Sequence, residues 1–165
     1  MPATDDERRD VLPTTREPSS TVTRHMLAWV EHAVIGLNLC PFAKAPWVKG
    51  QVRCVVSASQ DPASLLEELR AELQLLVETD PRKTETTLLV VPDQFAEFDD
   101  FNQFLDNATN RAPYPTLHLL RENSIERAVE AFPQAEAIYE TNIRTLRELG
   151  ESGWAALQKR IGHEP

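Results

Sequence analysis

The sequence predicts an α/β domain in which a small, largely parallel sheet of about three strands is covered by about five to six helices. The first observation behind this prediction is that two short, β-branched segments, 51–57 and 85–91, flank an amphipathic helical pattern, which is typical of a βαβ unit over residues 51–91. The second is the unbroken apolar run 88–91, which indicates a strand buried on both faces, as in a parallel sheet. Most of the remaining chain has apolar residues at helical spacing.

The chain has 165 residues, which is long enough for one domain with a substantial core. Residues 1–20 are polar, contain prolines and lack apolar periodicity, so we expect a disordered N-terminal tail. Residues 21–165 are expected to form a single domain.

The first helix is predicted over 21–39, where one apolar stripe recurs every three to four residues. His25 and His32 lie nearly opposite that stripe, so we expect both to face solvent. The Cys40–Pro41 step should end the helix, because a residue that precedes proline is pushed out of the α region. After the strand at 51–57, Asp61 is the expected N-cap and Pro62 the first residue of a helix that ends near residue 80.

The second half of the chain continues this alternation. After the strand at 85–91, an aromatic helix is predicted over 95–105, followed by a turn-rich stretch and a short strand at 116–120. Asn123 and Glu126 have capping-box spacing, and the helix they begin should turn Ile125 and Val129 toward the core. A longer helix follows Pro133 and should end at Gly150, with a last short helix over 154–161.

Composition excludes several classes of protein. A net charge of −9 opposes phosphate backbones, so we expect no non-specific nucleic-acid binding. No apolar run approaches the roughly 18 residues of a membrane span, and no signal peptide is visible, so a cytoplasmic location is expected. The two cysteines are too few for a disulfide framework and have no histidine at zinc-ligand spacing, and no phosphate-binding loop is present. No metal is indicated, and the sequence leaves the cofactor and the oligomeric state unknown.

The stretch 110–127 is the densest in chemically active side chains. His118, in the short strand, is a candidate general acid or base, and the alternative is a core histidine bonded to backbone. Cys40 is a candidate nucleophile. Its position at a helix C-terminus argues against that role, because the partial negative charge there raises a thiol pKa, and a structural cysteine is the alternative.

Arg111 and Arg121 are candidate ligands for a small anion, because guanidinium groups match carboxylates and phosphates. Pairing with local acids is the alternative for both arginines. Asn110, Tyr114 and Glu122 lie close to them in the sequence and complete the candidate binding set. These residues support a hydrolase or transferase that acts on a small anionic substrate, but whether the chain is an enzyme stays open. A non-catalytic ligand-binding or regulatory module and a structural protein without a site are the alternatives.

Three phrases carry a family resemblance: IGLNLCPFA at 35–43, ETTLLV at 85–90, and TNR at 109–111 followed by PYPTLHLLRE at 113–122. With them, the chain resembles the bacterial family known as domain of unknown function 1415, over nearly all of 29–154. The resemblance implies a bacterial cytosolic protein but no particular activity. The family pattern has a further segment, with an apolar strand leading to a Phe-His-Pro motif, where Asp106 here runs directly into Asn107. The resemblance therefore implies an internal deletion that removes a strand and a candidate histidine.

Overall fold

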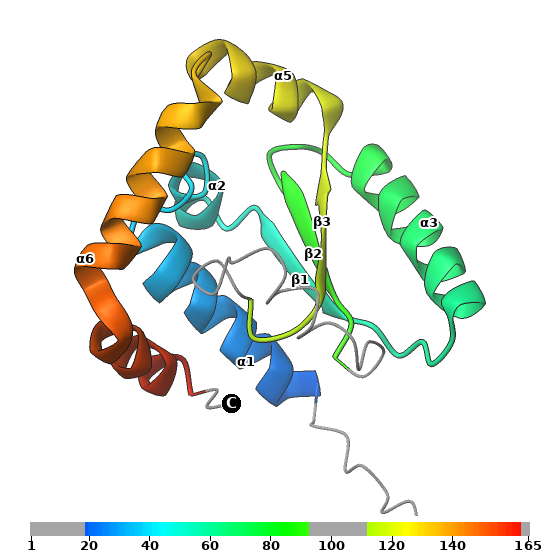
Figure 1. Cartoon of the computed structure of the whole chain (residues 1–165). Coiled ribbons are helices and arrows are strands. Elements are labelled where there is room, and N and C mark those ends of the chain that lie inside the picture. The colour runs from blue at the N-terminus through cyan, green and yellow to red at the C-terminus, as the bar shows by residue number, and fades with distance from the viewer. Residues whose placement is uncertain (1–18, 93–111, 163–165) are drawn as a thin grey trace, which may run out of the picture.

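The computed structural model describes residues 19–92 and 112–162, which form an α/β domain built on a three-stranded sheet (Figure 1). The predicted mixture of helices with a small sheet is confirmed. The predicted aromatic helix at 95–105 lies outside the described residues, as do residues 1–18 of the predicted tail. In chain order the elements are α1 (Ser19–Trp29), the π-helix η1 (Val30–Ile35), α2 (Lys44–Val48), β1 (Val52–Val56), α3 (Pro62–Glu78), β2 (Thr86–Val90), β3 (Thr116–Leu120), α5 (Glu122–Ala131) and α6 (Ala135–Ile161).

The sheet has the order β1-β2-β3, with β1 parallel to β2 and β3 antiparallel to β2. The βαβ unit is confirmed, because α3 returns the chain to the end of the sheet where β1 begins, and β2 then runs parallel to β1. The prediction of a largely parallel sheet is wrong, since one of the two strand pairs is antiparallel. The physical reason is at the end of β2, where the Val91 N–H donates to the Pro115 carbonyl at 2.8 Å. The chain therefore enters β3 at the same end of the sheet where it leaves β2, so β3 must run in the opposite direction.

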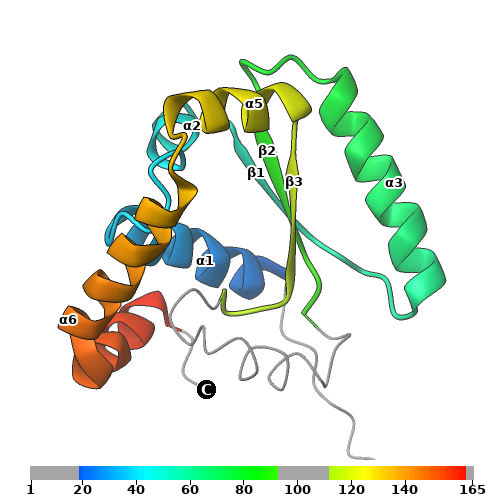
Figure 2. The same cartoon turned by 45° about the horizontal axis from the view of Figure 1, so that its top comes forward.

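Side chains alternate between the two faces of the sheet. Leu88 and Val90 of β2 pack with Met26 of α1 in one core cluster, and Leu89 and Val91 pack with Leu65 of α3 in another. All five residues of β2 are buried, which confirms the prediction of a strand covered on both faces. Figure 2 shows α3 on one side of the strands and α1 with α6 on the other.

α1 is covered on two sides, and this overturns one expectation. Met26 packs on the sheet, whereas Ala28 and Trp29 pack against the cluster that contains Leu157 and Ile161 of α6. His25 is only 5% exposed, so the prediction that it faces solvent is wrong. The helical-wheel reasoning assumed one buried stripe, but a helix between a sheet and another helix buries two. His32 is half-buried.

α3 follows its sequence signals closely. The Asp61 carboxylate accepts from the backbone N–H groups of Ala63 and Ser64, both at 3.0 Å, and Pro62 is the first helical residue. These bonds satisfy donors that no helical carbonyl can reach, which is why an aspartate at this position fixes the helix start.

α5 departs from its predicted cap and from its predicted core face. It begins at Glu122, with Arg121 at the N-cap position and no side-chain capping bond, so the predicted capping box at Asn123 is wrong. Ile125 and Val129 are 48% and 61% exposed, so the apolar stripe of α5 is left largely uncovered. In α6, Gly150 has φ 64° and ψ 178° and interrupts the helix, as predicted. Asn142 of α6 donates to the Leu39 carbonyl at 2.9 Å and ties the helix to the loop after η1.

Candidate functional site

His118 is held in one orientation by a short relay of hydrogen bonds. Its Nε2 lies 2.8 Å from Thr86 Oγ1, and the Thr86 hydroxyl donates to the Leu119 carbonyl at 2.8 Å. A hydroxyl has one proton, and that proton is used toward Leu119, so Thr86 must accept from the histidine. Nε2 is therefore the protonated nitrogen of the neutral ring, and the lone pair is on Nδ1.

His118 is exposed to solvent, whereas the residue that its ring bonds is buried. The bonded residue is Thr86, which is only 6% exposed. Burial lowers the pKa of His118 below its ordinary value. The imidazole is thus neutral near pH 7, and its unprotonated Nδ1 can accept a proton from a bound molecule.

Arg121 acts as a clamp between chain segments that are distant in the sequence. Its Nη2 donates to the Thr79 carbonyl at 2.6 Å and to the Thr84 carbonyl at 3.0 Å, while its Nε is buried without an acceptor among the described residues. The guanidinium therefore joins the end of α3, the approach to β2 and the end of β3. Its Nη2 is thus used by two backbone carbonyls.

The neighbours of Arg121 form a second polar link across the sheet end. Ser124 and Arg127 of α5 both bond the Glu85 carboxylate, which precedes β2. Glu122 is exposed at the first position of α5 and has no side-chain bond to another described residue. Asn110 and Arg111 lie outside the described residues.

Tyr114 is buried against His25. Its hydroxyl lies 2.8 Å from His25 Nδ1, and the two rings stack with centroids 6.0 Å apart. Tyr114 is 7% exposed, so its ring surface is packed rather than open. This pair joins the segment before β3 to α1, and helical-wheel reasoning missed it because it placed His25 in solvent.

The two cysteines lie apart from His118. Cys40 is half-buried in the loop after η1, and no bond among the described residues connects it to His118. Cys54 lies on β1 in the same row as Leu88 and His118, separated from His118 by the middle strand. Burial raises the pKa of Cys54 to about 11, so this thiol stays protonated at neutral pH.

The opposite face of the sheet has a polar cluster that sequence reasoning missed. Ser57 and Ser59, which follow β1, both donate to the Glu68 carboxylate, and Arg53 pairs with Glu72 one helical turn further along α3. The four-residue spacing of Glu68 and Glu72, opposite polar residues of the preceding strand, was the available signal. These contacts fix α3 on the β1 side of the sheet.

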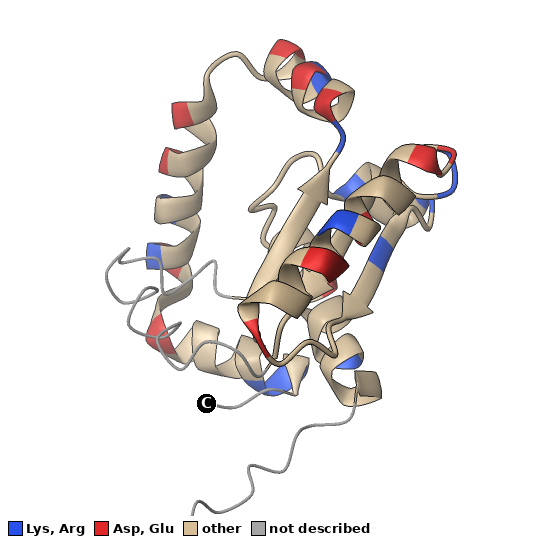
Figure 3. Cartoon of the chain, turned by 90° about the vertical axis from the view of Figure 1, so that its right-hand side faces the viewer, with Lys and Arg blue, Asp and Glu red and all other residues tan. Residues whose placement is uncertain are grey.

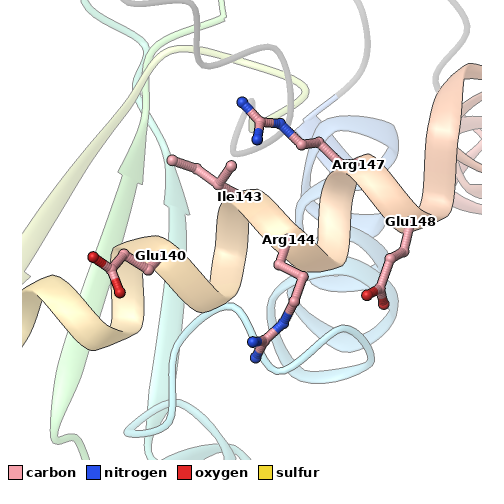
Figure 4. A pocket seen from close by; sticks show the side chains of 5 residues that line it. All are labelled: Glu140, Ile143, Arg144, Arg147 and Glu148. Atoms are coloured by element: carbon pink, nitrogen blue, oxygen red, sulfur yellow. The ribbon is translucent and has the colours of Figure 1, made fainter.

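A shallow hollow of about 330 Å³ lies on α6, away from His118 (Figure 4). Arg144 and Arg147 line it with Glu140, Ile143 and Glu148, all from the same helix. His118 is an exposed residue and does not line this hollow. No group of three or more His, Cys, Asp or Glu residues gathers as a metal site in the described part of the chain. Within that same part, no helix has both the length and the apolarity needed to cross a membrane.

Comparison with known proteins gives a family for the chain. The family described as "Protein of unknown function (DUF1415)" matches residues 21–109 and 105–156. No curated protein and no solved structure matches. The matched spans cover most of the α1-to-α6 domain, including β3 with His118 and the Arg121 clamp. The chain therefore belongs to the DUF1415 family.

Proposed function

We propose that this protein binds a small molecule on the open surface beside β3 and that His118 accepts a proton from it. The supporting observation is the relay from His118 Nε2 through Thr86 to the Leu119 carbonyl. The relay fixes the tautomer and leaves Nδ1 as an oriented acceptor. Because His118 is an exposed residue, a molecule at the surface can reach this lone pair.

The chemistry of this acceptor suits a general base. A neutral imidazole can take the proton of a hydroxyl group or a water molecule as that oxygen attacks, which is a step that hydrolases and transferases share. A small anionic substrate remains the expected class. Arg121 donates from Nη2 to two backbone carbonyls, so that nitrogen is not available to an anion.

The second candidate is a binding module without turnover. Cys40, the candidate nucleophile, is half-buried in the loop after η1, and no bond among the described residues connects it to His118. Among the described residues, Thr86 is the bonded partner of the His118 ring, and a threonine cannot supply or remove a second proton at neutral pH. A single oriented acceptor is sufficient for recognition, whereas most acid–base reactions also need a proton donor.

Matched substitutions at Thr86 test the relay. Nitrogen NMR of the histidine rings reports which nitrogen carries the proton in the free protein. We expect the Nε2–H tautomer in the wild type and in Thr86→Ser, which keeps the hydroxyl, and a mixture of tautomers in Thr86→Val, which removes it.

A ligand screen tests the function itself. Small hydroxycarboxylic acids and phosphate monoesters would be titrated against the wild type, and the His118 ring signals would be followed. For any compound that binds, His118→Gln should weaken affinity by about tenfold, the loss expected for one buried or half-buried hydrogen bond. Equal binding by the wild type and by His118→Gln, or an Nδ1–H tautomer in the free protein, would contradict the proposal.

A further inference from the structure

The free edge of β3 has backbone groups that no described residue satisfies. The Val91 N–H donates to the Pro115 carbonyl, so Val91 and Pro115 are a hydrogen-bonded pair of the antiparallel ladder. Such pairs alternate, so Leu117 and Leu119 also direct their N–H and C=O groups toward β2. The backbone groups of Thr116, His118 and Leu120 must then point away from the sheet, and they have no backbone partner among the described residues.

This edge lacks the features that usually prevent strands from pairing. Residues 116–120 contain no lysine and no proline, and they keep a regular register with β2 without a bulge. Leu117 and Leu120, on opposite faces, are 37% and 43% exposed. Figure 3 shows β3 without charged residues beside helices that carry many. The other edge strand, β1, is only half-exposed and carries Arg53 in an ion pair with Glu72.

We infer that two copies of the chain pair through their β3 edges in an antiparallel, twofold arrangement centred on His118, which gives one continuous six-stranded sheet. A second copy is the occupant we infer, because a register centred on His118 covers the exposed Leu117 with an apolar residue and sets no charged residue of 116–120 opposite another. His118 meets His118 of the partner subunit, and Thr116 meets Leu120 of the partner subunit. Each of these opposed pairs can exchange two hydrogen bonds, so the arrangement can form about six.

The side chains agree with this register. Leu117 comes to lie opposite Leu119 of the partner subunit, which covers the exposed part of Leu117 with an apolar neighbour. Leu120 lies beside the small Thr116 of the partner subunit. Each chain has a net charge of −9, but residues 116–120 contain no acidic side chain, so this register sets no like charges directly opposite each other in the paired strands. The two His118 rings lie side by side on one face, so the partner copy adds a residue to the candidate site.

Sedimentation velocity of the full chain over a wide concentration range tests the pairing. We expect a monomer–dimer equilibrium whose dissociation constant rises by about tenfold or more in Leu117→Lys, because symmetry places the new charge twice in the contact. Val77→Lys is the matched control. Val77 is an apolar residue of α3 that is 75% exposed, and its replacement adds the same charge away from the edge. It should leave the dissociation constant unchanged.

Amide hydrogen exchange of the wild type gives a second readout that does not depend on any variant folding. In dilute protein the amides of Thr116, His118 and Leu120 should exchange faster than those of Leu117 and Leu119, and raising the concentration should slow the first three selectively. A chain that stays monomeric, a dimer that Leu117→Lys and Val77→Lys affect equally, or edge amides that stay fast in the dimer would overturn the inference. Ligand binding by the His118 ring can be measured in dilute monomer, so failure of the dimer leaves the proposed function standing.

Discussion

Replacing Arg121 with methionine should destabilise the domain far more than a comparable change at a surface ion pair. The substitution keeps most of the aliphatic length and removes the guanidinium that bonds the Thr79 and Thr84 carbonyls at 2.6 and 3.0 Å. A hydrogen bond from a charged donor contributes about 1.5–3 kcal/mol, and bonds that share one nitrogen do not add fully. We therefore expect the free energy of unfolding to fall by about 2–4 kcal/mol.

Urea denaturation followed by circular dichroism measures this loss. With a slope of about 2 kcal/mol per molar, typical of small domains, the midpoint should move down by about 1–2 M. Arg127→Met is the matched control. Arg127 makes one ion pair to Glu85 with its side chain 59% exposed, so its loss should cost about 0–1 kcal/mol. Equal midpoint shifts for the two variants would refute the clamp and would return Arg121 to the set of free anion-binding groups.

Three further predictions follow from single features. Cys54, with a pKa of about 11, should react with iodoacetamide at pH 8 about a hundredfold more slowly than a thiol of pKa 9. If mass spectrometry of the native protein found Cys54 labelled as fast as such a thiol, the burial of Cys54 would be contradicted. Burial lowers the pKa of His118 in the folded protein, so the stability that depends on a neutral ring is present above the unfolded pKa near 6.5 and is lost as the pH falls below it. The melting temperature of His118→Gln should therefore fall less than that of the wild type between about pH 7.5 and pH 5. Parallel curves of melting temperature against pH would count against this. Gly150→Ala places a side chain at φ 64° and should lower the free energy of unfolding by about 1 kcal/mol or more, whereas an unchanged urea midpoint would mean that the kink relaxes freely.

Local signals predicted the parts of the fold that local physics decides. The start of α3 was readable because Asp61 and Pro62 satisfy or avoid backbone donors within one turn. The burial of β2 on both faces was readable from its apolar run. The break at Gly150 was readable because a positive φ strongly favours glycine.

The features that the sequence did not predict depend on contacts between distant segments. The direction of β3 depends on where the chain returns after β2, which no periodicity within residues 116–120 encodes. The burial of His25 depends on Tyr114, 89 residues away. The partners of Arg121 could not be predicted either: anion binding and pairing with local acids were the two alternatives, whereas the carbonyls it binds precede it by 37 and 42 residues.

The candidate site was predicted in part. The sequence predicts His118 as a candidate general acid or base, and the strand that carries it has the predicted bounds, 116–120. Its relay partner Thr86 could not be identified, because the relay requires the register that sets Leu88 opposite His118 and brings Thr86 within reach of the ring. A histidine can be identified as a candidate from its local sequence, whereas its tautomer depends on which side chain lies beside the ring in the folded protein.

The backbone bond between Val91 and Pro115 has a consequence for the connection between β2 and β3. It fixes the two ends of the β2-to-β3 connection next to each other, whatever length of chain joins them. Loop-closure entropy grows slowly, by about 0.6 kcal/mol for each doubling of length. A change in the length of this connection should therefore cost little stability, because the bond between Val91 and Pro115 already holds β2 and β3 together at this end of the sheet.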